Sequence, residues 1–105
     1  MSEEYPTMVG NVIGVKTPAE MAKIFSRHGI NATHNEYCVR ITDFDYFKIE
    51  FDKGISQVFS DADEPEELIF QASAISEVLT SEKVQHEFEI YDAAGDTLLA
   101  RYRYD

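Results

Sequence analysis

The fold is decided by residues 37–60, YCVRITDFDYFKIEFDKGISQVFS, in which apolar and polar side chains alternate along two runs. Alternation with a period of two is typical of a β-strand with one buried face, and it puts Tyr37 on the apolar side of the first run. Turn-forming residues follow each run, first Asp43 to Asp45 and then Asp52-Lys53-Gly54. The stretch therefore predicts three antiparallel strands in sequence order, at 37–42, 47–51 and 55–60.

Before this stretch, the sequence predicts one strand and one helix. Residues 8–16, MVGNVIGVK, are rich in valine and isoleucine, which favours a strand that its two glycines weaken. Thr17-Pro18-Ala19-Glu20 combines a capping threonine, a proline at the first helical position and a glutamate three residues after the cap. We therefore expect a helix from near Thr17 to Gly29, followed by a polar loop at 31–36. The predicted apolar stripe of this helix comprises Met21, Ile24, Phe25 and His28.

After this stretch, the sequence predicts a second helix and a hairpin. Asp63 and Glu66 repeat the capping-box spacing, and an apolar stripe at helical spacing follows them. Alternation resumes over residues 84–91 and 98–104, with a glycine-containing turn between the two runs. The chain is therefore expected to adopt an α+β fold of order β-α-β-β-β-α-β-β, with two helices packed on one face of a largely antiparallel sheet. The stripe of the second helix is Leu68, Ile69, Ala72, Ile75 and Leu79.

Length and composition indicate one globular domain. The chain has 105 residues, of which 44% are apolar, and this is enough for a single core. We expect residues 1–7 to be a flexible N-terminal segment and residues 8–105 to form a single α+β domain. No apolar run is long enough to span a bilayer, and the first residues carry acids where a signal peptide carries bases. We therefore expect a cytoplasmic protein.

The negative charge of the chain is concentrated in one third of its length. The whole sequence has 20 acidic and 9 basic residues, a net charge of −11. Residues 61–92 contain ten of the acids and one base, Lys83, so this segment alone has a net charge of −9. A one-sided acidic surface repels nucleic acids and anionic membranes and attracts basic partners. We therefore expect a basic protein partner, with no direct contact to nucleic acid or membrane.

Residue patterns for catalysis, cofactors or metals are sparse. Gly10 and Gly14 fit neither the dinucleotide-binding pattern nor a P-loop. Cys38 is the single cysteine, which excludes a disulfide within the chain and a cysteine-rich zinc site. His34 and Cys38 lie in a predicted loop and a predicted strand, so their spacing does not indicate a shared metal ion. We therefore expect no cofactor, no metal site and no catalytic residue.

Two groups of residues are candidates for binding a partner. Five carboxylates fall within seven residues at the predicted start of the second helix, where the helix dipole favours each by about 0.3–1 kcal/mol. Five are more than one helix terminus needs, and a basic partner would relieve their mutual repulsion. In residues 101–104, arginine and tyrosine alternate, both types that are enriched at interfaces, and the arginines are expected to pair with Glu87 and Glu89. The predicted partner-binding residues are Asp61, Asp63, Glu64, Glu66, Glu67, Tyr102 and Tyr104.

Three classes of function are compatible with these features. The first is a non-enzymatic acidic module that neutralises or inhibits a basic partner protein, as immunity proteins, nuclease inhibitors and DNA-mimicking inhibitors do. In layout alone, residues 17–104 resemble the type III secretion chaperones, which implies as an alternative a dimeric protein that binds a client. The third class is a small enzyme with a carboxylate site at Asp43 and Asp45. The first class predicts a monomer and the second a homodimer.

Overall fold

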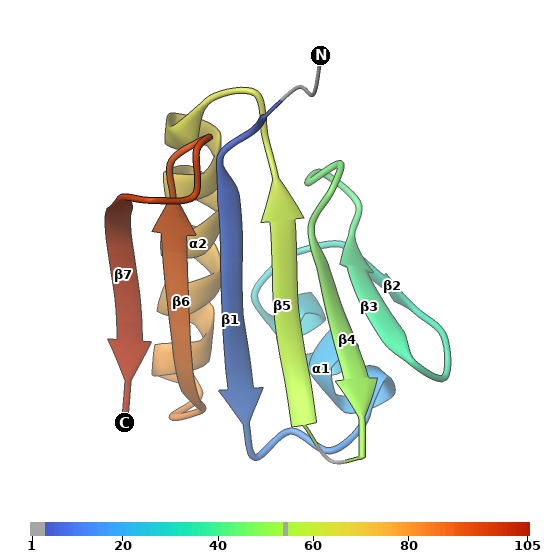
Figure 1. Ribbon diagram of the computed structural model, residues 1–105. Coiled ribbons are helices and arrows are strands. Elements are labelled where there is room, and N and C mark those ends of the chain that lie inside the picture. The colour runs from blue at the N-terminus through green and yellow to red at the C-terminus, as the bar shows by residue number, and fades with distance from the viewer. Residues whose placement is uncertain (1–3, 54) are drawn as a thin grey trace.

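The computed structural model describes residues 4–53 and 55–105, and within them the chain forms a seven-stranded antiparallel sheet with two helices (Figure 1). The predicted α+β class and the predicted order of elements are confirmed, with one additional short strand. The helices are α1 (Pro18–Arg27) and α2 (Pro65–Ser81). The strands are β1 (Thr7–Ile13), β2 (Ala32–His34), β3 (Cys38–Ile41), β4 (Lys48–Asp52), β5 (Ile55–Asp61), β6 (Gln85–Tyr91) and β7 (Leu98–Tyr104).

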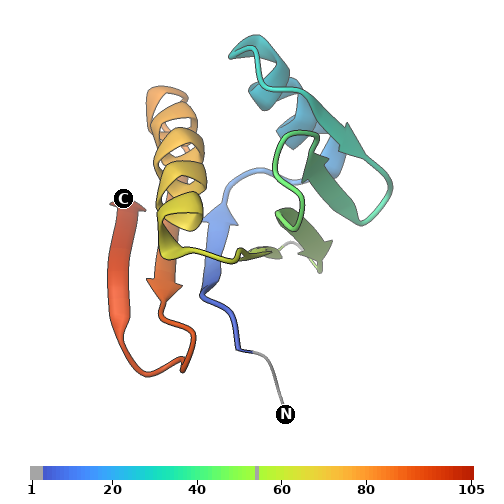
Figure 2. The ribbon, with the colours of Figure 1, turned by 90° about the horizontal axis from the view of Figure 1, so that it is seen from above.

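The strands lie in the order β2-β3-β4-β5-β1-β6-β7. β3, β4 and β5 form the predicted run of sequential antiparallel strands, and β6 and β7 form the predicted hairpin. β1 lies between β5 and β6, so the first strand of the chain joins these two groups. Both helices lie on the same side of the sheet, where α2 contacts β6, β7 and β1, and α1 contacts β2 and β3 (Figure 2). In the described part of the chain, no helix lies on the opposite face of the sheet.

The core lies between the helices and the sheet. Phe25, Phe47 and Phe88 are its largest fully buried side chains. Phe88 on β6 lies next to Gly10 on β1, and a Cβ atom at position 10 would meet the carbonyl oxygen of Glu87 and the Phe88 ring. Gly10 is therefore needed because the two strands and the aromatic ring approach closely at this point. The other core residues include Met8, Val12, Met21, Ile24, Val39, Ile49, Val58, Leu68, Ile75, Leu79 and Ile90.

The loop predicted at residues 31–36 is wrong, because Ala32–His34 form β2 and pair with β3. The sequence does not predict this strand, because it is three residues long and none of its residues is fully buried, so it has no clear apolar pattern. The side-chain oxygen of Asn35 then accepts hydrogen bonds from the backbone N–H groups of Tyr37 and Cys38. This turn removes Tyr37 from the predicted strand and leaves its side chain 69% exposed.

The predicted start of α1 is confirmed. The Thr17 side chain accepts a hydrogen bond from the backbone N–H of Glu20, and Pro18 occupies the first helical position. The Glu20 carboxylate accepts from the backbone N–H of Lys16, one residue before the cap. α1 ends at Arg27, and Gly29, with a φ of 75°, forms the predicted left-handed stop after the cap. The prediction that His28 belongs to the buried stripe is wrong, because His28 is the C-terminal cap and lies at the surface.

The predicted capping box of α2 is also wrong. Glu64, not Asp63, is the N-terminal cap, and it makes no side-chain capping hydrogen bond. Pro65 explains the shift, because its fixed φ and missing N–H suit the first helical position and place the cap one residue before it. The carboxylates around this helix start are therefore not used to cap it.

The first strand is shorter than predicted. β1 ends at Ile13, because Gly14 takes a φ of 95° and turns the chain towards α1. Of the expected flexible segment, residues 1–3 lie outside the described residues. Pro6 is buried and its carbonyl oxygen accepts from Ala62, and Thr7 already belongs to β1. In the predicted turn after β4, Gly54 also lies outside the described residues.

Candidate protein-binding surface

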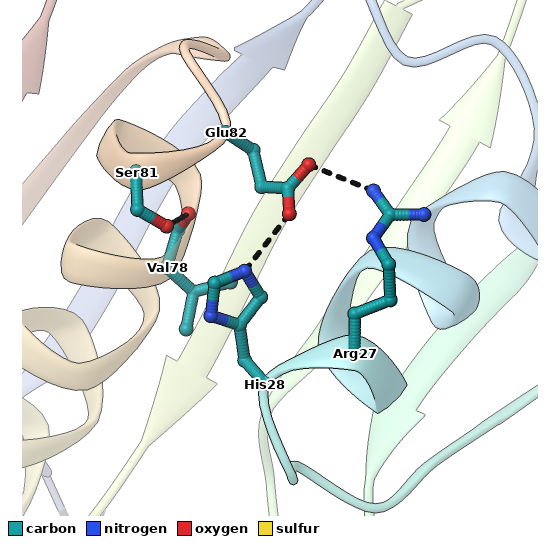
Figure 3. A network of polar contacts seen from close by, with 5 residues as sticks. All are labelled: Arg27, His28, Val78, Ser81 and Glu82. Carbon is teal, nitrogen blue, oxygen red and sulfur yellow. Dashed lines mark hydrogen bonds and ion pairs between the residues drawn. The ribbon is translucent and has the colours of Figure 1, made fainter.

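Four of the ten acids in residues 61–92 are held by local partners. Glu82, which follows α2, accepts from Arg27 at 2.7 Å and lies 2.9 Å from the Nε2 atom of His28, as Figure 3 shows. Both partners come from the end of α1, so this contact joins the C-terminal ends of the two helices. The hydrogen bonds that the Glu82 carboxylate accepts, first from Arg27 and then from His28, lower its pKa.

The other three are on or beside the β6–β7 hairpin. Glu89 pairs with Arg101 at 2.7 Å and Glu87 with Arg103 at 3.6 Å, which confirms the pairing predicted for these arginines. Asp92 accepts hydrogen bonds from backbone N–H groups of the turn, chiefly that of Thr97, and these bonds lower its pKa. Glu82, Glu87, Glu89 and Asp92 therefore serve the fold.

We expect Glu82→Gln to lower the melting temperature at neutral pH, because the ion pair between the Glu82 carboxylate and Arg27 is lost. The pKa of Glu82 lies below its usual value of 4.5, so the bridge stabilises the protein above that pH and weakens as the pH falls through the lowered pKa. The difference between wild type and variant should therefore shrink in acid. Thermal unfolding over a pH series measures it, with Glu77→Gln at an exposed position of α2 as the control. A difference that does not change with pH would contradict this role.

The remaining carboxylates near the start of α2 have a different environment. The side chains at 61, 63, 64, 66 and 67 are all exposed, and no ion pair involving them is present in the described parts of the chain. Glu66 and Glu67 lie in the first turn of α2, where the helix dipole favours negative charge. Asp61 and Asp63 precede the helix, and the closely spaced carboxylates of this segment repel one another.

The fold brings a second acidic turn to this place. The β3–β4 connection and the β5–α2 loop lie at the same end of the sheet, at the top of Figure 1. Phe44 in the first turn makes an edge-to-face contact with Phe70 on α2, with ring centroids 6.3 Å apart. Phe44 also contacts the buried ring of Phe47, which anchors the pair to the core. Asp43 therefore lies beside Glu66 and Glu67 of α2, and Asp45 follows Phe44 in the same connection.

Large aromatic side chains are exposed among these acids. Phe70 is 67% exposed and Tyr46 is 66% exposed. Exposed aromatic rings surrounded by polar groups are typical of protein interaction sites. We call this region the acidic-aromatic surface, and its members are Asp43, Phe44, Asp45, Tyr46, Asp61, Asp63, Glu64, Glu66, Glu67 and Phe70.

Two shallow hollows indent this surface. One, of about 380 Å³, has Phe44 and Phe70 as its aromatic walls and three carboxylates around it, those of Asp43, Glu66 and Glu67. The other, of about 220 Å³, is lined by Tyr5, Tyr46, Asp61, Ala62 and Asp63. Each hollow therefore combines aromatic surface with negative charge. This combination suits a long cationic side chain.

Tyr102 and Tyr104 do not join this surface. β7 ends with them at the opposite end of the sheet from the start of α2 (Figure 1). Both are half-buried: Tyr102 packs against the core, and Tyr104 stacks on the buried ring of His86 with centroids 6.4 Å apart. The structure thus separates the two groups of residues that the sequence proposed for partner binding.

The sequence reasoning missed Phe44, Tyr46 and Phe70 as candidate site residues. Phe70 was detectable, because it falls outside the apolar stripe of its helix and an aromatic residue on the polar side needs an explanation. Phe44 and Tyr46 alternate with Asp43 and Asp45 in a turn, and sequence alone does not show where that turn lies.

The two residues considered for a metal site lie on neighbouring strands. Cys38 is half-buried at the start of β3, and His34 lies on the neighbouring strand β2. No group of three histidine, cysteine or acidic side chains within residues 4–53 and 55–105 is placed to hold a metal ion. In the same residues, neither helix has the length and hydropathy needed to cross a membrane.

Protein-family models, curated proteins and solved structures were compared with this chain, and none of them matches it. We therefore infer function from the side chains of the acidic-aromatic surface.

Proposed function

We propose that the protein is a non-enzymatic binding module that neutralises or inhibits a basic partner protein through the acidic-aromatic surface. The observation that carries this proposal is the position of seven unpaired carboxylates around exposed aromatic rings, within the described residues. The carboxylates supply long-range attraction, and the aromatic rings supply short-range contact area.

The charge distribution also supports the choice of partner. Glu82, Glu87 and Glu89 are paired with arginines, whereas the carboxylates of the acidic-aromatic surface, at one end of the molecule, have no ion pair within the described residues. Nucleic acid and anionic membranes are repelled by such a surface, whereas lysine-rich and arginine-rich proteins are attracted. We propose a cytoplasmic protein that acts as a monomer. A stable homodimer in light scattering would instead favour the chaperone-like alternative, in which the protein holds a client.

The test is a charge reversal on α2. Glu66→Lys combined with Glu67→Lys changes the net charge from −11 to −7 and leaves the buried stripe of the helix intact. Association with the basic protein captured from the native source should slow by about tenfold or more at low ionic strength, because long-range attraction steers the encounter. The difference from wild type should narrow as salt is added. Stopped-flow association rates over a salt series measure both effects.

A matched variant separates local attraction from total charge. Glu36→Lys combined with Glu77→Lys makes the same change in net charge at exposed positions outside the acidic-aromatic surface. We expect this variant to associate much faster than the Glu66/Glu67 variant at low salt. Equal association rates for the two variants would show that the acidic-aromatic surface contributes to solubility and has no specific role in recognition. An acidic partner, or a folded Glu66/Glu67 variant with the wild-type rate, would overturn the proposal.

A further inference from the structure

The Phe44–Phe70 pair is an unusual feature for a surface that is otherwise polar. Phe70 projects from α2 with two-thirds of its side chain exposed, and its ring lies at 80° to that of Phe44. The pair is held in place, because Phe44 packs in turn on Phe47, a fully buried residue. An apolar surface of this kind is fixed before any partner arrives.

Three carboxylates surround this aromatic pair. Asp43 comes from the β3–β4 connection, and Glu66 and Glu67 come from the first turn of α2. They line the same hollow of about 380 Å³ as the two rings. An apolar side chain seated here would leave these carboxylates without a counter-charge. A cationic side chain can make a cation–π contact with the two rings and also pair with the surrounding carboxylates.

We propose that this hollow is a recognition site for an arginine side chain of the partner, seated on the Phe44–Phe70 pair. This inference rests on the proposed function and specifies which side chain of the basic partner is recognised. A guanidinium group is planar, stacks on aromatic rings, is weakly hydrated and presents several N–H donors to surrounding carboxylates. The lysine ammonium group is compact and strongly hydrated, so it gains less from the rings. The negative charge of the surface attracts arginine and lysine equally. The aromatic hollow favours arginine, so it distinguishes the two.

The experiment compares two probes of equal charge, an oligo-arginine and an oligo-lysine peptide of the same length, titrated into the full chain by calorimetry. Wild type should bind the arginine peptide about two- to fivefold more tightly, which is the gain from one exposed cation–π contact. In Phe70→Ala this preference should disappear, because the arginine peptide loses more affinity than the lysine peptide. Phe70→Tyr, which keeps an aromatic ring, should retain the preference.

Ile55→Ala is the matched control, because Ile55 is 59% exposed and begins β5 at the other end of the sheet (Figure 1). It should leave both affinities at the wild-type value. Equal affinity of wild type for the two peptides, or a preference that survives in Phe70→Ala, would overturn the arginine site. If charge reversal at Glu66 and Glu67 still weakens both peptides, the proposed function stands. If wild type binds neither peptide, both proposals fail.

Discussion

Gly10→Val is expected to lower the free energy of unfolding by about 3 kcal/mol or more, because its side chain clashes with the neighbouring strand β6. The Cβ atom alone would lie 2.8 Å from the Phe88 ring and would also meet the carbonyl oxygen of Glu87. That oxygen belongs to the backbone of β6, and β1 is hydrogen-bonded on both sides, so neither strand can move aside without breaking a ladder. Overpacking usually costs about 1–3 kcal/mol, and a clash against backbone belongs at or above the top of that range.

Chemical denaturation followed by circular dichroism measures this effect, and Gly10→Ala provides a milder variant for comparison. Asn11→Val is the matched control, because it adds a β-branched residue to the same strand at an exposed position. We expect the order of midpoints to be wild type, then Gly10→Ala, then Gly10→Val, with Asn11→Val near wild type. A Gly10→Val protein with the wild-type midpoint would show that the two strands do not approach as closely as described.

Acidification should destabilise the protein through His86. Its side chain is 1% exposed on β6, and the ring lies between Phe88 and Tyr104. Its Nε2 atom lies 2.7 Å from the hydroxyl oxygen of Ser76 on α2, and its Nδ1 atom lies 2.8 Å from the carbonyl oxygen of Val84. These contacts suit a neutral ring that donates to Val84 and accepts from Ser76. Burial lowers the pKa of His86 below the usual value of 6.5.

The direction of the pH dependence follows from this shift. Below pH 6.5 the unfolded chain binds a proton at this histidine that the folded chain resists, so stability falls as the pH is lowered towards the folded-state pKa. Above pH 6.5 the contribution is complete. One such group gives a slope that approaches about 1.4 kcal/mol per pH unit within that window.

Urea denaturation at a series of pH values between neutral and mildly acidic measures the slope. His86→Phe should be less stable at neutral pH, because Ser76 loses its partner, and should show a flatter pH dependence in this window. His34→Gln, at an exposed position of β2, is the control and should keep the wild-type slope. A wild-type protein whose stability does not change through this window would contradict the buried neutral histidine.

The elements that could be predicted from the sequence are those that carry strong local chemistry. Thr17, Pro18 and Gly29 fix the ends of α1 through capping, a preset φ and a positive φ, and these act over a few residues. β2 escaped prediction because its pairing with β3 is a contact between two chain segments, with no apolar alternation of its own. The cap of α2 was predicted one residue too early, because Asp63 and Glu66 have the capping-box spacing, whereas Pro65 takes the first helical position and makes Glu64 the cap.

The candidate site was only partly predictable for a related reason. The acids near the start of α2 form a continuous run in the sequence and could be identified directly. Their neighbours, Phe44 and Tyr46, are brought to them by the sheet, which places the β3–β4 and β5–α2 connections at one end. Tyr102 and Tyr104 were chosen by residue type alone, and residue type does not show that they pack against the core and against His86.

The separation of matched from unmatched charge gives the molecule a permanent electric dipole. Glu82, Glu87 and Glu89 are neutralised beside their arginines, so the uncompensated negative charge lies towards the end of the sheet where α2 begins. In the field of a basic protein, such a dipole experiences a torque as well as an attraction. This torque turns the aromatic rings towards the basic protein before the two surfaces touch. A larger fraction of encounters then has the orientation needed for binding.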